Sequence, residues 1–197
     1  EDGSMFGEEY TLVAVADYVL SKRKGNTVSN MSSTRALRDI TEKAGGEYFA
    51  SAVGEVNVVN QMKAKNAVIG GEGNGGVIFP DLHYGRDSLI GIALVLSHMA
   101  QTGMSAKTLR NSYPQYHISK NKIELTPEID VDAVLKTMAT KYADQEVDTT
   151  DGVKIYIEKE WVHLRKSNTE PIIRIYSESK SAEAANALAE RIIAEIK

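Results

Sequence analysis

Cysteine is absent from this sequence of 197 residues. Its absence excludes disulfide frameworks, thiolate metal sites and cysteine nucleophiles. No apolar run approaches the roughly 18 residues that cross a membrane, and the first residues lack the basic and apolar segments of a signal peptide. The net charge is −4 and neither half of the chain is net positive, which argues against nucleic acid as the main partner. We therefore expect a cytoplasmic protein with no nucleic-acid partner and no membrane partner.

The rest of the composition is that of an ordinary folded protein. Hydrophobic residues make up 42% of the chain and charged residues 25%, close to the averages of globular domains. A chain of this length holds one large domain or two small ones. It begins at Glu1, and Glu1-Asp2-Gly3 is typical of a turn between two strands. We therefore expect the chain to be a fragment of a longer protein.

The first half, residues 1–112, alternates amphipathic helices with short apolar strands. Apolar spacing predicts helices around residues 12–20, 37–44, 58–62 and 86–102, and Ser33 is expected to cap the second of them. The predicted strands are 27–29, 48–53, 67–69 and 77–79. Strands that alternate with helices favour a three-layer α/β/α domain with a mixed sheet.

The second half, residues 113–197, has a different order of elements. An extended segment at 116–125 precedes a helix over about 130–143, and later come strands at 153–157, 161–164 and 172–176 and a helix at 181–197. The first two of these later strands are joined by a short hairpin turn. This order predicts a small α+β domain, an antiparallel sheet with helices on one face.

A polar loop with two arginines lies between two apolar strands of the second half. It reads Arg165-Lys166-Ser167-Asn168-Thr169-Glu170-Pro171-Ile172-Ile173-Arg174. Its guanidinium, hydroxyl and amide groups, with the backbone N–H groups of a tight turn, are the donors that hold a phosphate. An ordinary hairpin loop with solvated arginines is the alternative interpretation.

A glycine-rich run follows the strand predicted at 67–69. It reads Gly70-Gly71-Glu72-Gly73-Asn74-Gly75-Gly76, and glycine lets a backbone turn sharply and approach a ligand closely. Glu72 and Asn74 can hydrogen-bond the vicinal hydroxyls of a sugar. The run is neither a dinucleotide fingerprint nor a Walker A loop, because no helix opens directly after it and the Lys-Ser/Thr pair is missing. A flexible turn without a ligand is the alternative interpretation.

Taken together, the two loops resemble those of the α-D-phosphohexomutases, which include phosphoglucomutase, phosphomannomutase and phosphoglucosamine mutase. The run at 165–174 resembles the family's phosphate-binding loop, Arg-x-Ser-(Asn/Gly)-Thr-Glu-Pro. The run at 71–76 resembles its sugar-binding loop, Gly-Glu-x-Ser-Gly-His. Val53-Gly54-Glu55 is a weaker match to a family loop that approaches the substrate. The resemblance covers essentially the whole chain, as the last two of the family's four domains.

The resemblance implies an intramolecular phosphotransferase that interconverts hexose 1-phosphate and hexose 6-phosphate. It implies a phosphoserine, a bisphosphate intermediate and Mg²⁺, with glucose, mannose and glucosamine all open as the hexose. The implied phosphate-binding residues are Arg165, Ser167, Asn168, Thr169 and Arg174, and the implied sugar-binding residues are Glu72 and Asn74. The catalytic serine loop and the acidic metal-binding loop are not in this sequence. The resemblance therefore implies that they lie in missing N-terminal domains, and that this chain alone binds hexose phosphate weakly and is inactive.

The sequence departs from the family pattern at Gly76, which stands where the sugar-binding loop has histidine. His83 is a candidate substitute, although a surface histidine explains it as well. Arg86-Asp87 is expected to open the long helix, and a position at the border of the site is the alternative. Ser32-Ser33 does not replace the catalytic serine, because the histidine expected after that serine is missing and helix capping explains Ser33. A stand-alone phosphosugar-binding module is the alternative function, because it needs only the two loops.

Overall fold

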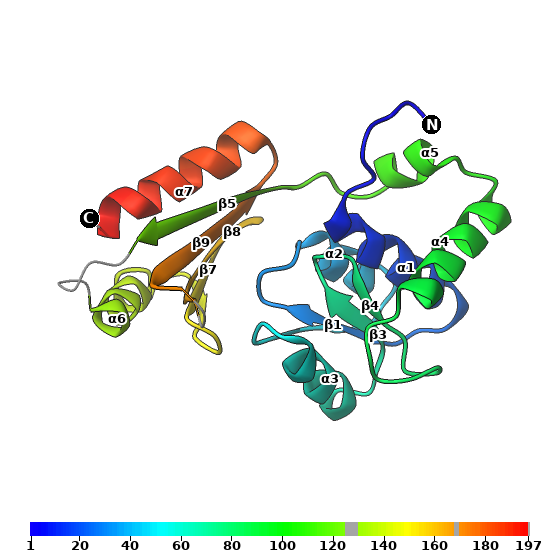
Figure 1. The fold of residues 1–197 in the computed structure, drawn as a ribbon, viewed down its shortest axis with the longest axis horizontal. Helices are drawn as coiled ribbons and strands as arrows, with labels where there is room; N and C mark the ends of the chain where they lie inside the picture. The colour runs from blue at the N-terminus through cyan, green and yellow to red at the C-terminus, as the bar shows by residue number, and fades with distance from the viewer. Residues whose placement is uncertain (125–129, 168–169, 197) are drawn as a thin grey trace. The chain divides into compact units, whose positions relative to one another are not determined.

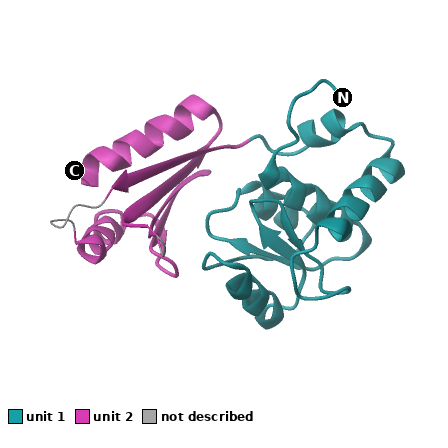
Figure 2. Ribbon diagram, in the orientation of Figure 1, with its two compact units in different colours: residues 1–115 teal, residues 116–197 magenta. Residues whose placement is uncertain are grey.

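In the computed structural model the chain forms two compact units, residues 1–115 (unit 1) and 116–197 (unit 2) (Figure 1, Figure 2). The structure describes residues 1–124, 130–167 and 170–196. Unit 1 ends three residues beyond the boundary expected from the sequence, because Tyr113 and Pro114 are still tied to its first helix, α1 (Glu8–Lys22). Tyr113 Oη donates to Asp17 at 3.2 Å, and Tyr10 Oη donates to the Pro114 carbonyl at 2.7 Å.

Unit 1 is built around a four-stranded mixed sheet with the strand order β2-β1-β3-β4. β1 runs parallel to β2 and β3, whereas β4 is antiparallel to β3. After α1, its elements are β1 (Asn26–Asn30), α2 (Ala36–Lys43), β2 (Tyr48–Ser51), α3 (Glu55–Ala64), β3 (Ala67–Glu72), β4 (Gly76–Ile78), α4 (Ser88–Thr102) and α5 (Ala106–Asn111). α5 was not expected, because its six residues are too few to show a clear helical period.

Helices cover both faces of this sheet (Figure 1). On one face α3 packs Val58 and Met62 against Val28 of β1. On the other face the Thr41 hydroxyl of α2 lies 2.7 Å from that of Thr27, and α1 packs along β3 beside α4. Helices therefore pack on both sides of the strands, which confirms the predicted three-layer arrangement.

Unit 2 is an antiparallel sheet with the order β5-β9-β8-β7-β6. Its elements are β5 (His117–Glu124), α6 (Val131–Lys141), β6 (Glu146–Asp148), β7 (Val153–Ile157), β8 (Glu160–Lys166), β9 (Ile172–Ser179) and α7 (Ala182–Ile196). Met138 of α6 and Leu188 of α7 join one core with Ile155 and Ile175 of the sheet, so both helices cover the same face. This confirms the predicted α+β fold. Across all described residues, no helix has the length and apolar character needed to span a membrane.

Candidate functional site

The glycine-rich run forms a shorter loop than the sequence predicts, because Gly70, Gly71 and Glu72 belong to β3. A side chain at Gly70 would meet Met62 Sδ at 2.6 Å, and one at Gly71 would meet the Gly76 carbonyl oxygen at 1.9 Å. These two glycines therefore serve close packing inside the sheet. Only residues 73–75 turn the chain between β3 and β4, and Gly75 has the left-handed φ of 86° that the turn requires.

Glu72 is the carboxylate that this hairpin places at the end of β3. It is buried, with 5% of its surface exposed. Its Oε1 accepts a hydrogen bond from Asn30 Nδ2 at 3.0 Å, and its Oε2 accepts one from Arg86 Nη1 at 3.2 Å. A buried carboxylate is stable only when it is paired and hydrogen-bonded, and these two partners meet that need. A carboxylate can accept about four hydrogen bonds, so Glu72 is held in place with acceptor capacity left for a ligand.

Ser33 holds the backbone of the turn and does not cap a helix, so the capping prediction is wrong. Its Oγ accepts from the Gly73 N–H at 2.9 Å and donates to Asn30 Oδ1 at 3.0 Å. The N-cap of α2 is Arg35, which makes no side-chain cap bond. Because β1 and β3 are parallel neighbours, the segment after β1 reaches the same sheet edge as Glu72 and supports the turn.

Asn74 is exposed at the tip of the turn. Its Oδ1 accepts from the Gly76 N–H at 3.1 Å, which fixes its side chain against its own loop. Beside it lies a shallow pocket of about 520 Å³. The pocket is lined by Glu55, Asn74, Gly75, Gly76, Val77, Arg86, Asp87 and Ser88. The loop therefore places a polar side chain at the edge of an open pocket, as a binding loop requires.

Arg86 was expected to open the long helix, with a position at the border of the site as the alternative, and the structure favours the alternative. α4 instead begins at Ser88, behind the N-cap Asp87, whose carboxylate accepts from the N–H groups of Leu89 and Ile90. Arg86 Nε donates to Glu55 Oε2 at 2.9 Å, and its Nη1 reaches Glu72. The Arg86 backbone N–H, followed by its guanidinium, holds the pKa of Glu55 below its usual value. The sequence feature that could have indicated this role is an arginine just before the aspartate that caps α4, ten residues after the glycine-rich run.

His83 contacts the helix cap and not Glu72. Its Nε2 lies 3.1 Å from Asp87 Oδ2, and half of its side chain is exposed. Hydrogen bonds from the Ile90 N–H and from His83 lower the pKa of Asp87, so the cap stays ionised. His83 therefore belongs to the start of α4, in agreement with the surface interpretation.

In unit 2, Arg165 of β8 and Arg174 of β9 are directly opposite each other in the antiparallel register. Arg174 Nη2 donates to Glu170 Oε2 at 3.0 Å, whereas no described residue accepts a hydrogen bond from its buried Nε. The Arg165 side chain makes no hydrogen bond or ion pair with any described residue, although the Arg165 backbone belongs to the β8–β9 ladder. Like charges directly opposite on neighbouring strands are destabilising, and an anion between them would relieve the repulsion.

The loop between the two arginines is only partly described. Ser167 is buried, and its backbone N–H donates to the Ile172 carbonyl at 3.0 Å. The Ile172 N–H in turn donates to the Glu170 carbonyl at 2.8 Å. These bonds close the base of the loop. Asn168 and Thr169, both predicted to bind phosphate, lie outside the described residues.

His163 lies two residues before Arg165, on the same face of β8. Burial lowers its pKa to about 4, and the nearby charges of Lys154 and Arg165 act in the same direction. Its Nε2 lies 2.7 Å from the Asp151 carbonyl, so the neutral ring donates there. The histidine therefore adds no further charge beside Arg165 at neutral pH.

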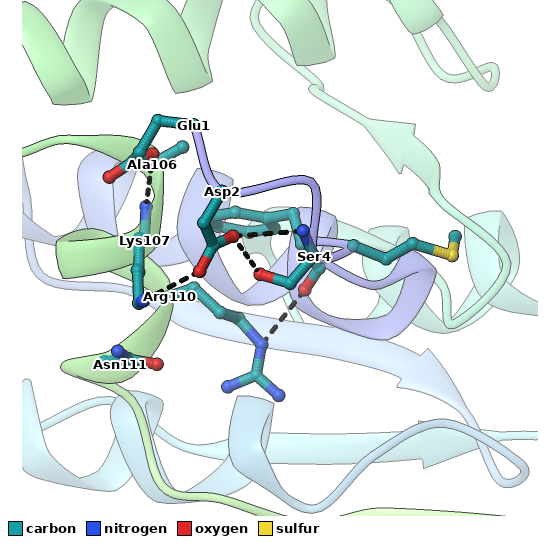
Figure 3. A pocket seen from close by; sticks show the side chains of 9 residues that line it. Glu1, Asp2, Ser4, Ala106, Lys107, Arg110 and Asn111 are labelled. Carbon is teal, nitrogen blue, oxygen red and sulfur yellow. Dashed lines mark hydrogen bonds and ion pairs between the residues drawn. The ribbon is translucent and has the colours of Figure 1, made fainter.

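A smaller pocket of about 80 Å³ lies between the first six residues and α5 (Figure 3). Its cations are already engaged: Lys107 Nζ lies 2.7 Å from Asp2, and Arg110 Nε donates to the Phe6 carbonyl at 3.0 Å. The Arg110 guanidinium also stacks on the Tyr10 ring at 3.2 Å. We therefore interpret this pocket as part of the packing contact between the N-terminal segment and α5.

Two family models match nearly the whole chain. Residues 7–116 match the phosphoglucomutase/phosphomannomutase alpha/beta/alpha domain III, and residues 122–195 match the phosphoglucomutase/phosphomannomutase C-terminal domain. The phosphoglucomutase/phosphomannomutase of Thermococcus kodakarensis is 37% identical over 188 residues, which are 94% of this chain and 41% of that protein. The chain thus spans less than half the length of this relative.

Solved structures give the same result. A phosphoglucomutase/phosphomannomutase family protein of Burkholderia thailandensis superimposes with a TM-score of 0.82 at 26% identity, covering 99% of this chain and 42% of its own. The N-acetylphosphoglucosamine mutase of Aspergillus fumigatus, solved with GlcNAc-6P and magnesium, shares the fold with a TM-score of 0.61 at 15% identity, over 94% of this chain and 45% of its own. The chain therefore belongs to the phosphoglucomutase/phosphomannomutase family, as the resemblance of its two loops indicated.

Proposed function

We propose that this chain is the C-terminal part of a phosphohexomutase, in which unit 1 binds sugar hydroxyls and unit 2 binds phosphate. The proposed reaction interconverts hexose 1-phosphate and hexose 6-phosphate, with glucose, mannose and glucosamine phosphates as the substrate class. The observation that carries the proposal is the pair Arg165 and Arg174, in register on adjacent strands with Arg165 unpaired among the described residues. Membership of the family and the partial coverage of its relatives support it.

The phosphate half of the proposal rests on uncompensated positive charge. A guanidinium can hold two oxygens of a phosphate at once, and no described residue takes up the side-chain donors of Arg165. Arg174 supplies the second positive charge of the pair, and no described residue accepts a hydrogen bond from its buried Nε. The buried Ser167 lies at the base of the same loop, and Asn168 and Thr169 complete the proposed donor set.

The sugar half of the proposal rests on fixed acceptors. Glu72 is oriented by Asn30 and Arg86, so its remaining lone pairs can accept hydrogen bonds from vicinal hydroxyls. Asn74 holds its carbonyl oxygen against the loop and keeps its amide N–H groups for ligand oxygens. An acceptor next to a donor is the combination that a diol requires.

Phosphoryl transfer depends mostly on positioning and charge stabilisation, and holding the hexose phosphate is the part that we assign to this chain. Among the described residues, no three His, Asp or Glu side chains come together as a metal site. We therefore propose that the Mg²⁺ ligands and the phosphoserine belong to other parts of the whole enzyme, and we assign no transfer step to the residues described above.

The test is a titration of the 197-residue chain with inorganic phosphate, followed by the backbone amide signals of unit 2. Arg165→Gln should weaken phosphate binding by ~10- to 100-fold, because it removes a charged, bidentate donor. Arg191→Gln is the matched control, since it removes one exposed positive charge from the same unit. Equal affinity in Arg165→Gln and the unchanged chain would reject the phosphate assignment.

A further inference from the structure

Arg86 joins two carboxylates that come from different elements of unit 1. Glu55 lies in the first turn of α3 and Glu72 at the end of β3. Arg86 binds Glu55 twice, through its backbone N–H and its Nε, both at 2.9 Å. Its Nη1 binds Glu72 at 3.2 Å. Arg86 therefore fixes the relative positions of the start of α3, the end of β3 and the segment before α4.

The three side chains of this bridge differ in burial. Glu72 has 6% of its side chain exposed, whereas Glu55 has 33% and Arg86 46%. An exposed ion pair contributes little energy, whereas removing the partner of a buried charge is costly. The link from Arg86 to Glu72 is therefore the one that matters for the position of the buried carboxylate, and Glu55 steadies the arginine from the solvent side.

Gly76 provides the space in which Arg86 lies. A Cβ at Gly76 would be 2.7 Å from Arg86 Cδ and 3.3 Å from Arg86 Cγ. The arginine stem thus runs directly over the glycine, on the way to Glu72. A histidine ring at position 76 and this conformation of Arg86 exclude each other.

We infer that Arg86 is a positioning residue for sugar binding, which fixes the Glu72 carboxylate by occupying the space left open at Gly76. The inference rests on the proposed function, because it assumes that Glu72 accepts hydrogen bonds from the sugar. Arg86 also lines the open pocket beside Asn74, and its Nη2 has no partner among the described residues. This N–H group remains as a donor to a sugar oxygen.

The test is a titration of the 197-residue chain with glucose 1-phosphate, followed by the amide signals of Gly73, Gly75 and Gly76. Arg86→Gln should weaken the binding seen at these signals by ~10-fold, because Glu72 loses its charged partner. Arg86→Lys should recover part of the loss, since it restores the charge without the two-pronged geometry. Glu55→Gln should weaken binding by only ~2- to 3-fold, because Arg86 keeps its bond to Glu72.

Two controls separate positioning from a loss of fold. Thermal unfolding of each variant shows whether unit 1 is intact, and inorganic phosphate binding at unit 2 should be the same in all four chains. If Arg86→Gln is folded and binds glucose 1-phosphate as well as the unchanged chain, the inference is wrong while the proposed function stands. If the unchanged chain shows no sugar-phosphate signal in unit 1, the sugar assignment fails and the inference fails with it.

Discussion

The two candidate binding loops differ in whether their charged side chains are paired with other protein groups. In unit 1 the Glu72 carboxylate is buried and already satisfied by Asn30 and Arg86. In unit 2 two arginines lie opposite each other, and Arg165 has no ion-pair partner among the described residues. In the first loop protein groups already pair with the carboxylate, whereas in the second two like charges are opposite each other and no described residue pairs with the Arg165 side chain.

This difference follows from what each loop is proposed to bind. A neutral hydroxyl adds only a modest hydrogen bond, so its acceptor must be oriented in advance for the bond to contribute to affinity. A phosphate brings a full negative charge, and it gains most where positive charge is concentrated and unpaired. The hydrogen-bonded Glu72 in unit 1 and the arginine pair in unit 2 would therefore suit the two different ligands that we propose.

The largest effect is expected from a substitution that disrupts the pairing of β3 and β4 in unit 1. Gly71→Ala places a Cβ 1.9 Å from the Gly76 carbonyl oxygen, so the β3–β4 pairing cannot persist unchanged. We expect unit 1 to lose ~3 kcal/mol or more of its free energy of unfolding. Chemical denaturation followed by the amide signals of unit 1 measures the loss.

Two observations control this prediction. Gly75→Asn is the matched variant, because Gly75 has open space around it and asparagine tolerates a positive φ. It should cost ~1 kcal/mol or less. Trp161, the single tryptophan, lies in unit 2, and its fluorescence transition should not move in either variant. A shift of that transition in Gly71→Ala would show that the two units are not independent.

A pH change should act on unit 2 through His163. Its pKa is about 4 in the folded chain against an ordinary value of 6.5, so as the pH falls the unfolded chain takes up the proton first. The stabilisation is complete above about pH 6.5 and is lost toward pH 4, by up to ~3 kcal/mol. Urea unfolding at pH 7 and 4.5, followed by Trp161 fluorescence, measures it.

The matched variants are His163→Gln and His117→Gln. Glutamine at 163 can still donate to the Asp151 carbonyl, yet it has no proton to gain, so the pH dependence should become shallower. His117 is exposed at the start of β5, and its replacement should leave the dependence unchanged. Identical pH profiles for His163→Gln and the unchanged chain would contradict the assignment.

The smallest effect is expected from removing the carboxylate that pairs with Arg174 in unit 2. Glu170 pairs with Arg174 at 3.0 Å, with 51% and 32% of their side chains exposed. Glu170→Gln removes a carboxylate that competes with phosphate for this arginine, and affinity for inorganic phosphate should rise by ~2- to 5-fold. Glu190→Gln, an exposed acid on α7, changes the net charge equally and should have no such effect. Equal gains in both variants would indicate a general field effect only.

Most of the fold could be predicted from the spacing of apolar residues. The alternation of β7 and the helical period of α7 are strong because one face of each packs on a shared core. β6 was missed because it is a three-residue strand at the sheet edge with a short, polar sequence. β3 was predicted too short because glycine weakens strand patterns, although Met62 and the Gly76 carbonyl leave room only for glycine there.

Site residues could be predicted where a local sequence motif contains them. They could not be predicted where the fold brings together residues that are distant in the sequence. Glu72 and Arg165 could be singled out from their loops, although their roles as ligands stay predictions. Ser33 was misassigned because a serine before a helix normally caps it, whereas parallel pairing of β1 and β3 brings it to Gly73. Arg86 was considered only as a residue that opens a helix or borders the site, because its pairing with Glu55 depends on the start of α3, 31 residues earlier.

The overlap of Arg86 with the space above Gly76 also constrains how the family can vary. A bulky residue at position 76 would clash with a long side chain at position 86 in the conformation of Arg86. Family members with histidine at the position of Gly76 should therefore carry something other than arginine at the position of Arg86. The two positions should covary in an alignment, and a grafted histidine at 76 should be tolerated only together with a second substitution at 86.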